Sequence, residues 1–235
     1  MDFIRKIKKL YNLNSESSGR SESEIADAEY VLSVKIPPLL RRYYLEIGSL
    51  PAPEFAETPA LLLSLNELFI NDNYLVFYSG KHFGTEYFYI LLDDLDKENP
   101  KIYMKNGYIY TEYLDEFIQN IAFRHAIYSL KYTNKWKIRD AWNSGHYLHE
   151  KAYETMVKQW TKIRLRRREM NKRNKKYTEY TNDTFYTIDY SEIIDEGDSG
   201  DHDVTIEYGT SYEDRYIAFK EKIEREMEGY IEEIC

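Results

Sequence analysis

Two helical patterns separated by a pair of prolines constrain the fold of this sequence most strongly. Ser21 and Glu24 have the S-x-x-E spacing of a capping box, in which two side chains satisfy free backbone N–H groups at a helix start. Ile25, Ala28 and Leu32 then follow at helical spacing. Ile36 is predicted to be extended because Pro37 follows it. A second helix is predicted over residues 38–48, since proline suits the first helical turn and a glycine at position 48 suits the end.

The segments around this pair of helices change from helical to strand character in blocks. The N-terminus predicts a short amphipathic helix with Phe3, Ile7 and Leu10 on one side. Strand-like runs rich in aromatic and β-branched residues follow, at 74–78, 87–92, 101–105 and 108–110. Helical periodicity returns over residues 111–131. Because helices and strands do not alternate as βαβ units, we expect an α+β fold with a central antiparallel sheet flanked by helices.

Composition changes after residue 131, and we expect a domain over residues 1–131 with a mainly helical C-terminal extension over 132–235. Residues 141–176 predict a long helix whose end is basic, with ten basic residues and one acidic residue between Lys158 and Lys176. Eighteen acidic and four basic residues follow between Thr178 and Cys235. Two segments of the acidic part, 177–188 and 204–208, have some strand character. A final helix is predicted from a cap at Ser211.

Charge and cysteine content narrow the classes of function. The formal net charge of −9 makes nucleic-acid binding by the whole surface unlikely and suits a basic protein partner. Cys235 is the single cysteine, so no disulfide can form within the chain and a reducing compartment is the simpler interpretation. No stretch approaches the roughly 20 apolar residues that span a bilayer. These features predict a soluble, cytoplasmic protein without a membrane partner.

Catalytic, metal and cofactor patterns are weak, and we expect no enzyme activity, metal or cofactor. No serine lies in a G-x-S-x-G elbow, and Gly80-Lys81 lacks the remaining residues of a P-loop. His146 and His149 could share a helix face, but two candidate ligands are too few for a metal site. The acidic loop that begins at Asp195 lacks the glutamate that ends a calcium-binding loop of the EF-hand type.

Four segments in a fixed order resemble the SUKH superfamily, which includes cell-wall-assembly regulators of the Smi and Knr type. Residues 21–48 resemble its opening capped helix, hydrophobic-Pro step and second helix. Residues 75–92 are similar to the family's central hairpin, 99–104 to the following strand, and 111–127 to the closing helix. The hairpin departs from the family's usual turn and lacks its tryptophan, and the C-terminal hundred residues have no counterpart.

The resemblance implies a non-catalytic binding role on an α+β fold. Many bacterial members are immunity proteins that block secreted polymorphic toxins, often nucleases, by direct binding, and this is the function expected here. An intracellular scaffold or regulator of the cell-wall-assembly type is the alternative. Nucleic-acid binding through Lys158–Lys176, in which Trp160 could stack, is a third and less favoured reading.

The hairpin is the predicted site of partner binding. Alternation along a strand sends about half of its aromatic residues to the core and leaves the other half for a partner. Ordinary core and loop roles are the competing interpretation for each of them. The predicted partner-binding residues are Tyr78, Lys81, His82, Glu86, Tyr87 and Phe88.

Overall fold

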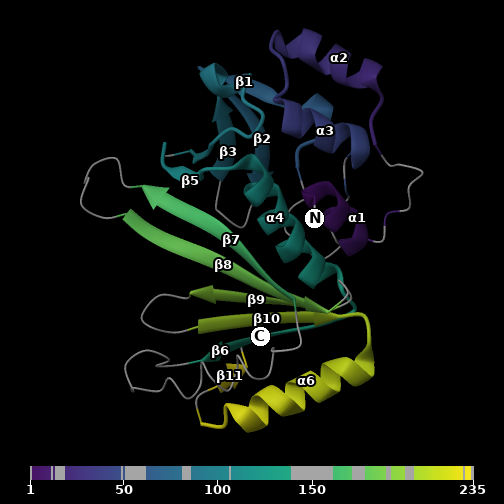
Figure 1. The fold of residues 1–235 in the computed structure, drawn as a ribbon, viewed down its shortest axis with the longest axis vertical. Coiled ribbons are helices and arrows are strands. Elements are labelled where there is room, and N and C mark those ends of the chain that lie inside the picture. Colours follow the sequence, from purple (N-terminus) through teal and green to yellow (C-terminus); the bar gives the residue numbers. More distant parts are fainter. Residues whose placement is uncertain are drawn as a thin grey trace. The chain divides into compact units, whose positions relative to one another are not determined.

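The computed structural model describes residues 2–11, 13, 19–48, 50, 62–80, 86–105, 107–138, 161–170, 178–188, 192–198, 204–229 and 231–233. The chain divides into two compact units (Figure 1). One consists of residues 1–125 with 166–181, and the other of 126–165 with 182–235. The boundary between residues 125 and 126 lies close to residue 131, where the first domain was expected to end. That the two expected domains fold independently stays a prediction.

Three helices begin the first unit. They are α1 (Phe3–Leu10), α2 (Glu22–Leu32) and α3 (Pro38–Glu46), and they match the predicted helices. The capping box at the start of α2 is present: the backbone N–H of Glu24 donates to Ser21 Oγ at 3.2 Å, and the Ser21 N–H donates to the Glu24 carboxylate at 2.8 Å. Gly48 follows α3 with a φ of 74°, which glycine adopts without a steric penalty.

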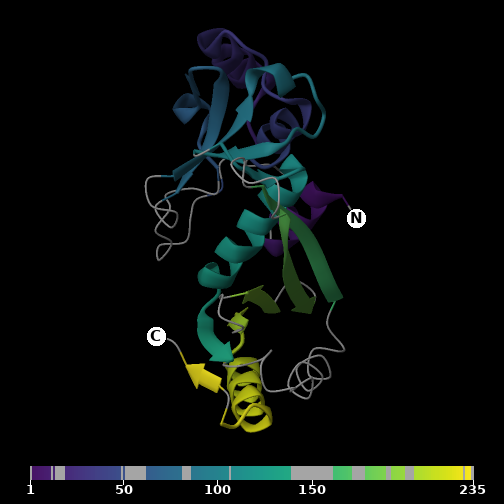
Figure 2. The same ribbon diagram turned by 90° about the vertical axis from the view of Figure 1, so that its left-hand side faces the viewer.

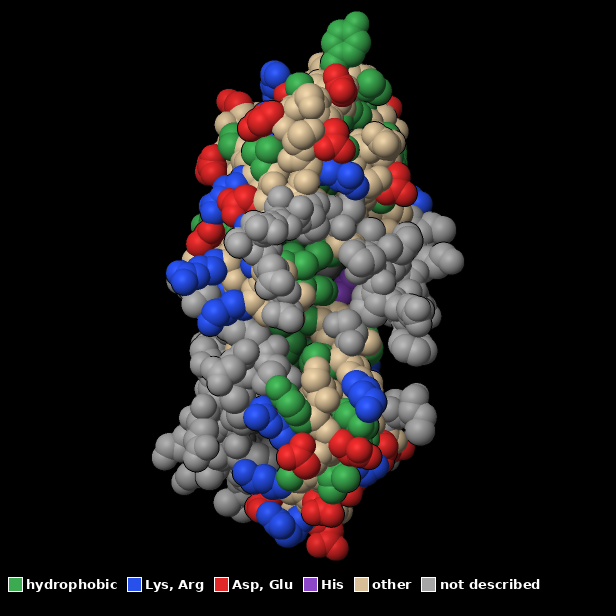
Figure 3. All heavy atoms as spheres, turned by 90° about the vertical axis from the view of Figure 1, so that its right-hand side faces the viewer, with side chains coloured by type: hydrophobic (Ala, Val, Ile, Leu, Met, Phe, Trp, Pro, Cys, Tyr) green, Lys and Arg blue, Asp and Glu red, His purple; other side chains and the backbone are tan. Residues whose placement is uncertain are grey.

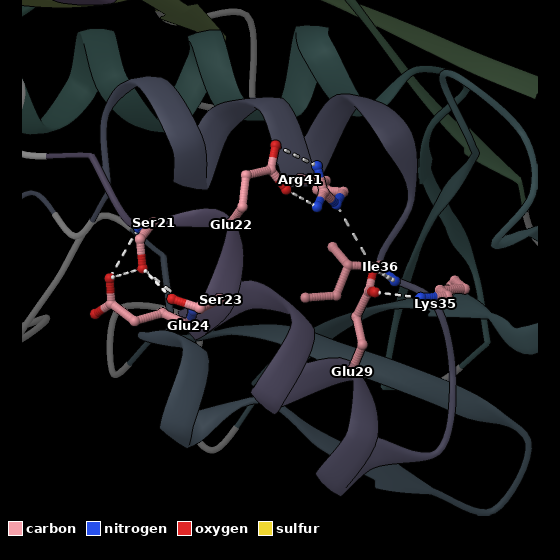
Figure 4. Close-up of polar contacts among 8 residues, drawn as sticks. All are labelled: Ser21, Glu22, Ser23, Glu24, Glu29, Lys35, Ile36 and Arg41. Atoms are coloured by element: carbon pink, nitrogen blue, oxygen red, sulfur yellow. Dashed lines mark hydrogen bonds and ion pairs between the residues drawn. The ribbon is translucent and has the colours of Figure 1, made fainter.

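Acidic residues of α2 hold the step between α2 and α3 (Figure 4). Glu22 forms an ion pair with Arg41 of α3. Glu29, which is 6 % exposed, accepts from the buried backbone N–H of Ile36 at 3.1 Å and from Lys35 Nζ at 2.7 Å. Ile36 is extended and precedes the proline pair, so without the Glu29 carboxylate its backbone N–H would have no acceptor. Glu29 therefore has a structural role, because it satisfies a buried backbone donor.

A five-stranded antiparallel sheet with the order β1-β2-β3-β4-β5 follows. Its strands are β1 (Phe69–Asn71), β2 (Tyr74–Gly80), β3 (Glu86–Leu91), β4 (Ile102–Met104) and β5 (Ile109–Thr111). Two short 3-10 helices, η1 (Leu65–Glu67) and η3 (Leu92–Asp94), precede β1 and follow β3. The predicted antiparallel α+β fold is confirmed.

Helix α4 (Leu114–Ser129) completes the core of the first unit. Its Phe117 lies edge-on to Phe77, Tyr78 and Tyr110, with ring centroids 5.3 to 5.6 Å apart. Apolar side chains of α1, α2, α3, β2 and β3 belong to the same buried cluster. The four helices therefore pack against one face of the small sheet and leave its other face to the tyrosines described below.

Within residues 132–235, the part that the structure describes is mainly β-structure, so the prediction of a mainly helical extension was wrong there. A six-stranded sheet has the order β11-β6-β10-β9-β8-β7. Its strands are β6 (Tyr132–Ile138), β7 (Thr161–Met170), β8 (Thr178–Ile188), β9 (Glu192–Asp198), β10 (Val204–Thr210) and β11 (Ile231–Glu233). Residues 161–170 form a strand where a helix was predicted, and 231–233 form a strand where the last helix was expected to continue. Residues 139–160, with His146 and His149, lie outside the described residues.

Helix α6 (Glu213–Glu226) packs on one face of this sheet (Figure 2). The Phe219 ring stacks on Tyr208 of β10 at 4.1 Å and lies 5.9 Å from the buried Trp136 of β6. The Tyr208 hydroxyl donates to the buried carboxylate of Glu192 at 3.0 Å, and burial together with this carboxylate raises the pKa of Tyr208. An aromatic layer thus joins helix and sheet.

Candidate protein-binding surface

A ladder of tyrosines covers the face of the five-stranded sheet that is turned away from the helices. We call the set Asn71, Tyr74, Tyr87, Tyr89 and Tyr103 the tyrosine face. Register explains why these residues share one face, because Tyr89 pairs with Tyr103 across β3 and β4, and residues two apart on a strand point to the same side. Leu75, Phe77, Phe88 and Ile90 alternate with them and point into the core.

The four rings are stacked on one another rather than spread apart. Tyr74 and Tyr89 lie 4.1 Å apart between ring centroids, Tyr89 and Tyr103 lie 5.6 Å apart, and Tyr74 and Tyr87 lie 6.0 Å apart, all three pairs in stacked orientation. Cross-strand aromatic pairs stabilise a sheet and hold each other's rotamers. Tyr89 is buried within this layer, whereas the other three rings are half-buried. The surface is therefore ordered before any partner arrives.

Hydroxyl groups gather at one end of the tyrosine face. The Tyr74 and Tyr87 hydroxyl oxygens are 2.8 Å apart, and Asn71 Nδ2 donates to both of them, at 2.9 and 3.3 Å. The hydrogen bond to Tyr87, then burial, raises the pKa of Tyr74 to about 12. Lys105 Nζ lies over the Tyr87 ring, 5.8 Å from its centroid. The face thus combines apolar rings with a neutral polar cluster and a cation.

The structure places the six predicted partner-binding residues in three different settings. Tyr87 belongs to the tyrosine face. Tyr78 and Phe88 are 1 % and 0 % exposed, so these two are core residues and their assignment to a partner surface needs correction. Glu86 pairs with Gly80 at the ends of β3 and β2. Lys81 and His82 lie outside the described residues.

A β-bulge explains why Tyr78 is in the core. Tyr74 and Val76 lie on the outer side of β2, and simple alternation would put Tyr78 there as well. The register of β2 against β3 shifts between Val76 and Tyr78, and a bulge of this kind moves the following side chain to the other face. Phe88 needs no such device, because it alternates with Tyr87 and Tyr89.

Sequence reasoning missed most of the tyrosine face. The signal that could have found it is the spacing of tyrosines two apart at positions 87 and 89, together with Tyr74 and Tyr103 at the matching positions of the neighbouring strands. No sequence pattern predicts the role of Asn71, because that role depends on the hydroxyl groups that the fold brings beside it. The basic segment considered for nucleic acid includes strand β7, and that use of it stays a prediction.

Comparisons with known proteins gave no match: no protein-family model matches the chain, and no curated protein or solved structure is significantly similar to it. The resemblance to the SUKH superfamily therefore stays a prediction. Among the residues that the structure describes, helices are too short or too polar to cross a membrane. In that same part of the chain, no group of three or more potential metal ligands comes together.

Proposed function

We propose that this chain is a non-catalytic immunity protein that binds a cognate polymorphic toxin and blocks it, with the tyrosine face as part of the contact surface. The observation that carries the proposal is the stacked ladder of Tyr74, Tyr87, Tyr89 and Tyr103 across three strands, on the sheet face turned away from the helices. Tyrosine is enriched in protein interfaces because it buries a large ring and keeps a polar tip.

Pre-stacking makes this face suited to binding. A side chain with many rotamers loses about 0.5–1.5 kcal/mol of conformational freedom when an interface immobilises it. The half-buried rings of Tyr74, Tyr87 and Tyr103 are already fixed by their neighbours, so most of this loss occurs during folding rather than during binding. The net charge of −9 adds long-range attraction to a basic toxin, such as a nuclease domain, and increases the association rate more than the affinity.

The test measures binding and protection with the toxin domain encoded beside this chain. Tyr87→Ala and Tyr103→Ala remove half-buried rings of the tyrosine face and are expected to weaken binding at least about fivefold each, as loss of an aromatic anchor does. Tyr212→Ala is the matched control, because Tyr212 is 47 % exposed and lies in the other unit. Equal affinity and equal cell survival for all three variants and the parent chain would remove the tyrosine face from the proposal. Failure of the parent chain to bind or protect would overturn the immunity function itself.

A further inference from the structure

The C-terminal half of α2 exposes two adjacent apolar side chains that the fold does not need. Tyr30 is 86 % exposed and Val31 is 81 % exposed, whereas no other large apolar side chain among the described residues exceeds 47 %. Valine is also a weaker helix former than most polar residues that could replace it at the surface. In Figure 3, hydrophobic side chains reach the surface at the upper end of the view, where Figure 1 places α2. Apolar groups exposed in this way mark interaction surfaces.

Hollows lie on both sides of this pair. A hollow of about 350 Å³ is lined by Val31, with Leu32, Leu65 and others behind it. A second hollow, of about 460 Å³, is lined by Tyr30 and Val34. The two exposed residues therefore form a ridge between depressions, a relief into which side chains of another protein can fit. We call Asp27, Tyr30, Val31 and the linings of these two hollows the α2 surface.

The charge of α2 decides which kind of partner fits. The helix carries Glu22, Glu24, Asp27 and Glu29 and no basic residue. Two cations line the hollows beside it, and each is paired: Arg20 with Glu24 and Lys35 with Glu29. Glu22 and Glu24 are engaged by Arg41 and by Ser21, and Glu29 is buried against the step. Asp27 forms no ion pair within the described part of the chain, is exposed, and lines the first hollow with Val31. One available carboxylate thus stands beside an apolar ridge.

We propose that the α2 surface binds a protein segment that presents a lysine or arginine next to apolar side chains. The cation pairs with Asp27 at the rim of the first hollow, while the apolar side chains cover Tyr30 and Val31. Because Arg20 and Lys35 are already paired with glutamates, the charge left over on this surface is the Asp27 carboxylate, which disfavours nucleic acid and anionic membranes. The α2 surface lies on the helical side of the first unit and the tyrosine face on the opposite side of the sheet, so the inference does not depend on the proposed function.

The experiment uses the full chain and two short synthetic peptides, one of alternating lysine and leucine and one of alternating glutamate and leucine. Fluorescence anisotropy gives the affinity, and nuclear magnetic resonance of the labelled chain maps the contact. The lysine peptide is expected to bind and to shift the resonances of Asp27, Tyr30 and Val31. Tyr30→Ser is expected to weaken binding at least about fivefold. Asp27→Lys is expected to reverse the preference in favour of the glutamate peptide.

Matched controls separate docking from general attraction to an acidic protein. Asp93→Asn removes an exposed carboxylate and Tyr113→Ser a 47 % exposed tyrosine elsewhere in the same unit, and neither is expected to change binding. Equal losses in the controls and in Tyr30→Ser would overturn the proposal, as would shifts confined to the tyrosine face. Binding of phosphatidylcholine vesicles that depends on Tyr30, without peptide binding, would also overturn it, because the occupant would then be a lipid surface.

Discussion

Replacing Glu29 by alanine tests how the helices α2 and α3 are joined. The Glu29 carboxylate is almost fully buried, and it accepts a hydrogen bond from the backbone N–H of Ile36, which is itself 3 % exposed. Alanine at position 29 leaves that N–H without an acceptor in a site closed to water. The second partner, Lys35, is different, because its side chain is 83 % exposed.

Ile36 and Lys35 are expected to contribute differently, and a third partner, Arg41 Nε, lies farther away at 3.9 Å from Glu29 Oε1. A hydrogen bond to a charged group contributes about 1.5–3 kcal/mol, whereas an exposed ion pair contributes about 0–1 kcal/mol. We therefore expect Glu29→Ala to lower the free energy of unfolding by about 2–4 kcal/mol. Glu29→Gln keeps an oxygen that can accept from Ile36, and it is expected to cost about half as much. Lys35→Ala is expected to cost less than about 1 kcal/mol.

Urea unfolding followed by circular dichroism measures these three free energies, and amide hydrogen exchange reports directly on the Ile36 N–H. In Glu29→Ala, exchange at Ile36 should become faster than in Lys35→Ala. A Lys35→Ala variant as unstable as Glu29→Ala would refute the reasoning, because the ion pair would then outweigh the backbone hydrogen bond. Undiminished protection of Ile36 in Glu29→Ala would refute it as well.

Three further predictions concern packing, a buried hydroxyl and pH. Gly209→Ala should destabilise the chain by about 1–3 kcal/mol in urea unfolding, because an added Cβ would lie 2.8 Å from the carbonyl oxygen of Ile127; an unchanged midpoint would show that α4 can move away. Tyr44→Phe should cost about 1 kcal/mol, since the hydroxyl donates to the carbonyl of Leu63 at 2.6 Å. Tyr43→Phe should cost almost nothing, because that buried hydroxyl has no hydrogen-bond partner in the described part of the chain, and equal losses for the two variants would contradict this. The side chain and then the backbone N–H of Ser64 hold the pKa of Glu67 below its usual 4.5, so the stability it contributes is present above pH 4.5 and is lost as pH falls through the lowered folded-state pKa. Urea midpoints measured from neutral to acid pH should therefore fall less steeply for Glu67→Gln than for the parent chain.

Local chemistry explains which parts of the fold could be predicted. The caps, the prolines and the glycine at position 48 act within a few residues of themselves, so the sequence predicts α2 and α3 and their bounds almost to the residue. Residues 161–170 were wrongly predicted as helix because Ile163 and Met170 fit an apolar stripe at helical spacing that runs through residues 141–176. The alternation of basic residues at 162, 164, 166 and 168 also fits a strand, and pairing with β8 in the sheet decides between the two.

At the candidate binding surface, too, the sequence predicts local structure but not the features that depend on strand pairing. Strand positions were predicted for the hairpin, but the bulge after Val76 decides that Tyr78 points into the core, and no residue type at this position announces it. The tyrosine face depends on the register of three strands, which only the folded sheet defines. Sequence reasoning could therefore locate the hairpin, but it could not assign its tyrosines correctly to the two faces.

The hydroxyl cluster of the tyrosine face keeps one hydrogen that it cannot donate within the cluster. Asn71 donates its two amide hydrogens to the hydroxyl oxygens of Tyr74 and Tyr87. One of these hydroxyls donates to the other, and the one that receives has then accepted twice and still holds its own hydrogen. That single hydrogen needs an oxygen from outside the cluster. In the complex that we propose, a carbonyl or carboxylate of the partner would accept this hydrogen in place of water, whereas a partner amide or ammonium group at the same point would meet a donor.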